Sequence, residues 1–180
     1  MNVDTPLMRL LRDHLLELAP LSIRPRDPAG RAAVDSPEEA AILDRFYPFA
    51  ELLFLVAGAD GRVETKERAA TLGAFVALTD GRLPRSTLER VEQAVTERAR
   101  RDGWERRVHR VCSDLSTDRE DAELAFTLAS AVALSDGVTT DSEWALLSFI
   151  AEGLGISPRR RDRLLEGALK SEPPPAFGPE

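Results

Sequence analysis

The chain has 180 residues, of which 43% are hydrophobic and 31% are charged, and its formal net charge is −7. This composition is that of a globular protein rather than a disordered one, and the acidic excess disfavours nucleic acid as a partner because the overall field repels phosphate. The single cysteine, Cys112, excludes an intramolecular disulfide. The N-terminal sequence has neither a signal-peptide pattern nor an apolar run long enough for a membrane anchor, so we expect a cytoplasmic protein.

Helical periodicity runs through most of the chain and predicts an all-α fold, a bundle of about seven or eight helices. A leucine stripe predicts the first helix over residues 4–18, and the proline-rich stretch that follows predicts a linker up to residue 36. Ser36 and Pro37 are typical of a helix start. They predict a second helix that runs to about residue 59 and is kinked or divided at Pro48.

The remaining elements are also predicted as helices. Their expected ranges are about 65–78, from a cap at Ser86 to about 101, 104–115, about 118–135, about 140–154, and 158 to about 170. Ser86 and Glu89 have the spacing of a capping box. Gly155 suits the left-handed residue after a helix, and Pro158 suits the first position of the next one. The proline-rich residues 171–180 predict a disordered tail.

Two acidic turns in the sequence are similar to each other. Each ends an apolar run with Asp-Gly and places a glutamate seven residues after the aspartate. Six residues of the first segment recur 76 positions later: Val56, Ala57, Asp60, Gly61, Glu67 and Ala69 correspond to Val132, Ala133, Asp136, Gly137, Glu143 and Ala145. The repeat predicts an internal helix–turn–helix duplication whose two apolar faces pack together as a pseudo-symmetric bundle.

This pattern, together with the "LGIS-P" turn into the last helix, resembles the TerB-like family, named for tellurite resistance protein TerB. The resemblance covers roughly residues 37–170, which we predict to be one TerB-like helical domain, and excludes residues 1–36 and the tail. It implies a stress-response role rather than catalysis, in the cytoplasm or at the inner membrane. It also implies a divalent-metal site formed by Asp60, Glu67, Asp136 and Glu143. The second turn differs from the first, because Val138 and Thr139 stand where the first has Arg62 and Val63.

The chemistry of the turns allows two interpretations. Carboxylates suit hard cations, so Ca²⁺ or Mg²⁺ is expected rather than Zn²⁺. Alternatively, Asp-Gly is an ordinary helix terminator, and Glu143 lies three residues after Thr140, which is the spacing of a capping box. The sequence therefore predicts a non-enzymatic TerB-like stress-response protein that binds divalent metal. The alternative is a metal-free helical scaffold for protein–protein interaction.

Other reactive or charged residues favour neither catalysis nor a small-molecule substrate. His109 and Cys112 are three residues apart, but the chain has too few such residues for a zinc site, and Cys112 is interpreted as a small core residue. The arginine-rich stretch 97–110 is interpreted as a solvated, self-paired face. With residues 159–163, it is also compatible with a protein partner or an anionic membrane surface.

Overall fold

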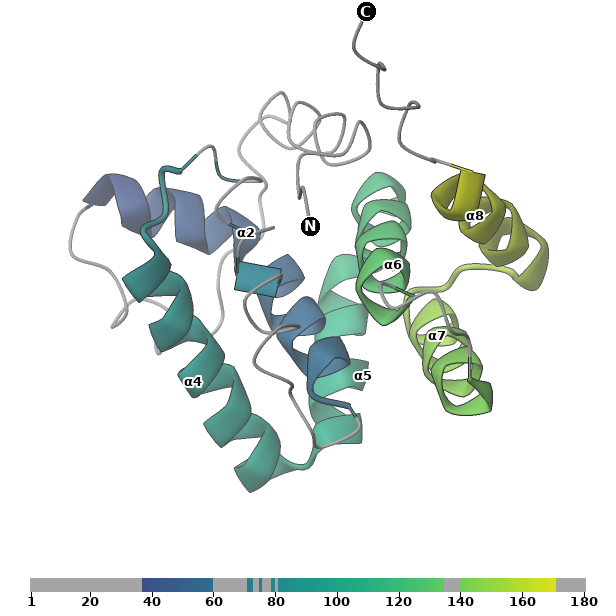
Figure 1. Cartoon of the computed structure of the whole chain (residues 1–180), viewed down its shortest axis with the longest axis horizontal. Coiled ribbons are helices and arrows are strands. Elements are labelled where there is room, and N and C mark those ends of the chain that lie inside the picture. The colour runs from purple at the N-terminus through teal and green to yellow at the C-terminus, as the bar shows by residue number, and fades with distance from the viewer. Residues whose placement is uncertain are drawn as a thin grey trace, which may run out of the picture.

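The structure is a computed structural model that describes residues 37–59, 71–72, 75, 79, 81–134 and 140–170. Within these residues it contains six helices and no strand, which confirms the all-α prediction. They are α2 (Pro37–Ala57), α4 (Arg85–Asp102), α5 (Trp104–Leu115), α6 (Arg119–Ala133), α7 (Asp141–Gly153) and α8 (Pro158–Lys170), shown in Figure 1. The predicted helix over 4–18, the linker and the tail lie outside the described residues. Of the predicted helix over 65–78, residues 71, 72 and 75 are described, and all three are helical.

Local chemistry forms three of the helix boundaries, and at two of them Gly155 and Pro158 act as the sequence predicts. The side chain of Asp118 caps α6 by accepting hydrogen bonds from the backbone nitrogens of Glu120, at 2.7 Å, and Asp121, at 3.2 Å. Gly155 has a φ of 70° after α7, and the backbone nitrogen of Ile156 donates to the Ala151 carbonyl at 2.8 Å. That pair of features is a Schellman ending, which stops α7 and lets α8 begin at Pro158.

The predicted cap of α4 is wrong. The residue before α4 is Pro84, with φ −64° and ψ 149°, and no side chain caps this end. Because α4 already begins at Arg85, Ser86 lies within its first turn, where its side chain cannot act as the N-cap. Glu89 pairs instead with Arg85, whose Nε lies 3.1 Å from Glu89 Oε1. The Pro84 carbonyl accepts the first hydrogen bonds of this helix, from the backbone nitrogens of Thr87 and Leu88, so the N-cap lies two residues before the predicted one.

Helix α2 contains Pro48 but is one continuous helix from Pro37 to Ala57. Figure 1 shows that the helix changes direction partway along its length, so that its two parts run at an angle to each other. A proline inside a helix lacks the N–H that would bond the previous turn, and this loss favours a bend. Of the two predicted outcomes, the helix therefore bends rather than divides.

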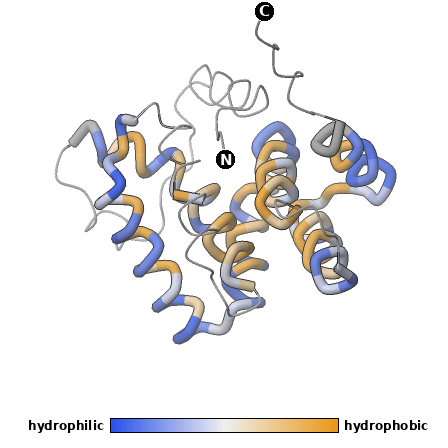
Figure 2. The backbone as a smooth tube through the Cα atoms, viewed as in Figure 1, coloured by the Kyte–Doolittle hydropathy of each residue, from blue (hydrophilic) through white to orange (hydrophobic). Residues whose placement is uncertain are grey.

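The core is centred on α2 and α6, which pack against each other. Helices α4 and α5 cover α2, while α7 and α8 pack against α6, and α5 also contacts α7. Figure 2 shows α6 as largely hydrophobic, whereas α4 is hydrophobic mainly along one side. The largest fully buried side chains include Phe49, Phe75, Phe126, Leu52, Leu88, Leu115 and Leu147. Burial of these residues supplies most of the free energy that stabilises the fold.

None of the helices within the described part of the chain combines the length and apolar character needed to cross a bilayer.

Candidate functional site

The helices that lead into the two acidic turns end at corresponding residues. Helix α2 ends at Ala57 and α6 ends at Ala133, which are matched positions of the 76-residue repeat. Their last backbone bonds also correspond: Gly58 nitrogen donates to the Phe54 carbonyl at 3.1 Å, as Leu134 nitrogen does to the Ser130 carbonyl at 3.0 Å. Both helices therefore end three residues before the aspartate of an Asp-Gly pair.

Of the four predicted metal ligands, only Glu143 lies within the described residues; Asp60, Glu67 and Asp136 do not. Glu143 forms a capping box with Thr140 at the start of α7. The backbone nitrogen of Thr140 donates to Glu143 Oε2 at 2.6 Å, and the Glu143 nitrogen donates to Thr140 Oγ1 at 3.3 Å. The capping prediction is therefore confirmed for the second turn. The structure does not test whether the four carboxylates converge.

Among the described residues, no group of three or more His, Cys, Asp or Glu side chains is placed to hold a metal ion. His109 is exposed on α5, whereas Cys112 has no exposed surface. Burial raises the pKa of the Cys112 thiol to about 12. The thiol is therefore protonated at neutral pH and acts as a core residue, as the sequence predicts, rather than as a nucleophile or a ligand.

Two arginines from the stretch 97–110 are buried against α2, so the prediction of a solvated face is wrong for them. Arg107 Nε donates to Glu51 Oε1 at 2.9 Å, and its Nη2 donates to the same oxygen. Arg98 donates to the hydroxyl of Tyr47, and its guanidinium carbon lies 5.5 Å from the Tyr47 ring centroid. These bonds are made inside the core, where a polar group without a partner would be costly.

The prediction holds for the other arginines of that stretch, since Arg100, Arg101, Arg106 and Arg110 are all exposed. Helical spacing distinguishes the two kinds. Arg98 lies three residues after the buried Val95, and Arg107 lies four residues before the buried Val111. The buried pair therefore continues the apolar stripes of α4 and α5, and this signal was already present in the sequence.

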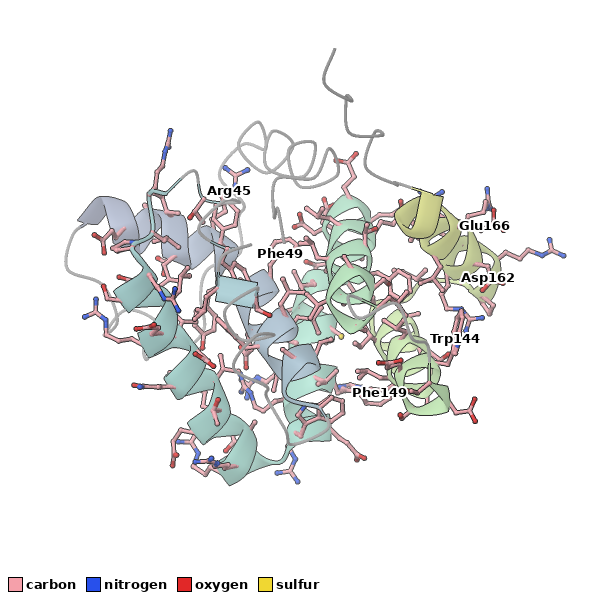
Figure 3. The ribbon with its side chains drawn as sticks, in the orientation of Figure 1. Arg45, Phe49, Trp144, Phe149, Asp162 and Glu166 are labelled. Atoms are coloured by element: carbon pink, nitrogen blue, oxygen red, sulfur yellow. The ribbon has the colours of Figure 1, made fainter. Side chains whose placement is uncertain are left out.

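Trp104 connects the end of α2 with α7. Its indole Nε1 donates to the Leu55 carbonyl at 2.9 Å, within the last turn of α2. Its ring stacks on Phe149 of α7, with 6.3 Å between ring centroids. Phe149 is 37% exposed and Trp144, on the same helix, is 42% exposed, and Figure 3 labels both on α7.

Comparison with known proteins identifies a family. A family model described as tellurite resistance protein TerB matches residues 48–166, about two thirds of the chain. No curated protein and no solved structure was found to match. The matched range begins within α2, ends within α8 and includes both acidic turns. The resemblance read from those turns is thereby confirmed, and the chain belongs to the family of tellurite resistance protein TerB.

Proposed function

We propose that this protein is a non-enzymatic stress-response member of the TerB family that binds a divalent cation through its two acidic turns. Membership of the family supports a tellurite-resistance-type role. In this proposal Asp60 and Asp136 are the primary ligands, and Glu67 and Glu143 complete the shell. Ca²⁺ or Mg²⁺ suits such an all-oxygen donor set better than Zn²⁺.

The observation that carries the proposal is the equivalence of the helices that precede the two turns. Helices α2 and α6 end at matched residues of the repeat and pack against each other. A further helix then packs on each of them, α4 on α2 and α8 on α6. This arrangement supports an internal duplication. A duplicated pair of turns provides two equivalent sets of carboxylates rather than one.

Capping accounts for the glutamate in one turn but not in the other. Glu143 has Thr140 three residues before it, and the two form the capping box. The corresponding position in the first turn is Glu64, whose side chain is not a typical N-cap. Glu67 therefore has no capping-box partner in the sequence, which favours another role for the repeated glutamate. The cap uses Oε2 of Glu143, and a carboxylate has two oxygens with which to bind.

The test is a thermal melt and a calorimetric titration of the chelated full-length protein with Ca²⁺, Mg²⁺, Mn²⁺ and Zn²⁺. An ion at a hundredfold excess over its dissociation constant should stabilise the fold by about 2.7 kcal/mol. For a chain of this size, that corresponds to a rise in Tm of about 5–11 °C. Asp60→Asn and Asp136→Asn should each reduce the rise.

The matched control is Asp141→Asn, which removes one exposed negative charge from the first turn of α7 but does not belong to the repeated motif. It should leave the ion response nearly unchanged if the ion is bound by specific ligands rather than attracted by the general charge. No heat and no change in Tm with any of the four ions would refute the metal site.

The second candidate is a metal-free scaffold for a protein partner, in the cytoplasm or at the inner membrane surface. The capping box of Glu143 and the exposed Trp144 on α7 favour it. Glu143→Gln separates the two candidates, because glutamine also serves a capping box but is a weaker ligand. The scaffold requires that Glu143→Gln melts like the wild type with or without ions. The metal site requires that this variant loses part of the ion response.

A further inference from the structure

Arg45 of α2 has a buried edge that forms no hydrogen bond. Its Nε and Nη2 atoms are both inaccessible to solvent, and neither has a hydrogen-bond partner among the residues that the structure describes. Arg45 lies one helical turn before the fully buried Phe49, and Figure 3 labels the two residues on the same helix. Buried polar atoms are almost always hydrogen-bonded in folded proteins. Two unsatisfied donors on one cationic side chain therefore point to a ligand.

The same edge of the guanidinium is used elsewhere in this protein to bind carboxylates. Arg107 donates from Nε and Nη2 to Glu51, and Arg160 donates from Nε and Nη2 to Glu123. These two donors are coplanar and point in the same direction, so they match the two oxygens of a carboxylate. Arg45 offers the same pair of donors.

We propose that the Nε–Nη2 edge of Arg45 is a binding site for a carboxylate. The nearest identified charge is that of Asp121, whose carboxylate is buried in the first turn of α6. Asp121 forms no hydrogen bond with either of the two Arg45 atoms, and its own Oδ2 is likewise buried and makes no hydrogen bond within the described part of the chain. Its charge therefore acts on the guanidinium without occupying this edge. Its negative charge also disfavours a dianionic phosphate more than a singly charged carboxylate.

The electrostatic environment of Arg45 supports the same conclusion. Burial lowers the pKa of the Arg45 guanidinium, and the charge of Asp121 only partly opposes this effect. A second carboxylate on the buried Nε–Nη2 edge would compensate for the lost hydration and satisfy both donors. The carboxylate belongs either to this chain or to a separate molecule, because both sources offer the same chemistry.

The experiment records the ¹⁵N–¹H signals of the arginine side-chain Nε groups in the full-length protein. Arg107 and Arg160 supply reference signals for an edge bound by a carboxylate, and the exposed Arg106 and Arg110 supply references for a solvated edge. Sodium acetate is the probe, and sodium chloride at equal ionic strength is the control. Arg45→Lys keeps the charge but removes the two coplanar donors.

Two results support the proposal and identify the source. If the Arg45 signal resembles the bound references before acetate is added, and one acid-to-amide substitution in the chain returns it to the solvated position, the carboxylate is the chain's own. If instead the signal moves saturably with acetate, the ligand is external. In that case Arg45→Lys should raise the apparent dissociation constant about tenfold or more, a change of about 1.4 kcal/mol, and Arg106→Lys should not change it.

A third result overturns the proposal. This is an Arg45 signal that coincides with those of Arg106 and Arg110 and responds equally to acetate and chloride. Spectra of the wild-type protein with acetate and with chloride are enough to give this third result, so refutation of the proposal does not depend on the stability of any variant.

Discussion

The buried ion pair between Glu51 and Arg107 gives the sharpest stability prediction. Both side chains are almost excluded from water, with 5% of Glu51 and 8% of Arg107 exposed. Glu51→Gln would remove the carboxylate and leave a buried guanidinium, from which another acidic side chain among the described residues, that of Asp102, is 3.9 Å away. Breaking a buried pair from one side costs about 3–5 kcal/mol. Glutamine can still accept one hydrogen bond from Arg107, so we expect the lower end, about 3 kcal/mol.

The assay is thermal and urea unfolding at neutral pH, followed by circular dichroism. A loss of about 3 kcal/mol corresponds to a fall in Tm of about 6–12 °C for a chain of this length. The matched control is Glu89→Gln, which makes the same chemical change in an exposed pair, where the side chains are 62% and 39% exposed. An exposed pair at this spacing contributes about 0.3–0.5 kcal/mol. Replacing both partners, as Glu51→Leu with Arg107→Met, should recover most of the loss because no buried charge remains. The reasoning is refuted if Glu51→Gln costs no more than Glu89→Gln.

Three further predictions follow from single contacts. The hydrogen bond from Arg160, and then that from Arg119, hold the pKa of Glu123 below its ordinary value. This stabilisation is therefore present above the unfolded pKa of about 4.3 and is lost as pH falls through the folded pKa. Glu123→Gln should unfold at a lower midpoint concentration of urea than the wild type at pH 7, and at nearly the same concentration near pH 3. Equal midpoints of the variant and the wild type at pH 7 would contradict this prediction. The pKa of Cys112 is raised to about 12, so its thiol should not react with a thiol reagent at pH 8 until the protein is unfolded. Rapid reaction of the native protein would show that the thiol is accessible. Gly153→Ala would place a Cβ 3.0 Å from the Cβ of Cys112. This crowding should outweigh the better helix propensity of alanine and lower the free energy of unfolding, measured in urea, by about 1 kcal/mol. A gain in stability would show that α5 and α7 can separate.

Local chemistry explains which helix boundaries could be predicted from the sequence. Asp118, Thr140 and Gly155 act within a few residues of themselves, and each forms the cap or turn that its residue type favours. The cap at Ser86 failed for a local reason too, because the N-cap is Pro84, two residues earlier. Boundaries of this kind are determined by the neighbouring sequence, so the type of each element was predicted more reliably than its exact first residue.

The buried polar contacts could not be predicted from local pattern in the same way. Arg107 and Glu51 are 56 positions apart, and Arg98 and Tyr47 are 51 positions apart. Only the packing of α4 and α5 onto α2 brings them together, and a charge run in sequence looks the same whether it is solvated or paired. The apolar stripe indicated that Arg98 and Arg107 face inward, but it could not indicate their partners. For the candidate metal site, the repeat identified the turns, and Glu143 is the one predicted ligand whose position could be compared.

Trp104 shows why the two acidic turns need not act independently if both bind a cation. Its indole holds the last turn of α2, five residues before Asp60, through the Leu55 carbonyl. Its ring stacks on Phe149 of α7, the helix that begins with the Glu143 capping box. One side chain of α5 thus contacts both the helix that enters the first turn and the helix that leaves the second. Displacement of α2 or α7 must break the hydrogen bond of Trp104 to Leu55, disturb its ring contact with Phe149, or move Trp104 itself. The packing of side chains, in addition to the chain itself, therefore links the two halves of the repeat.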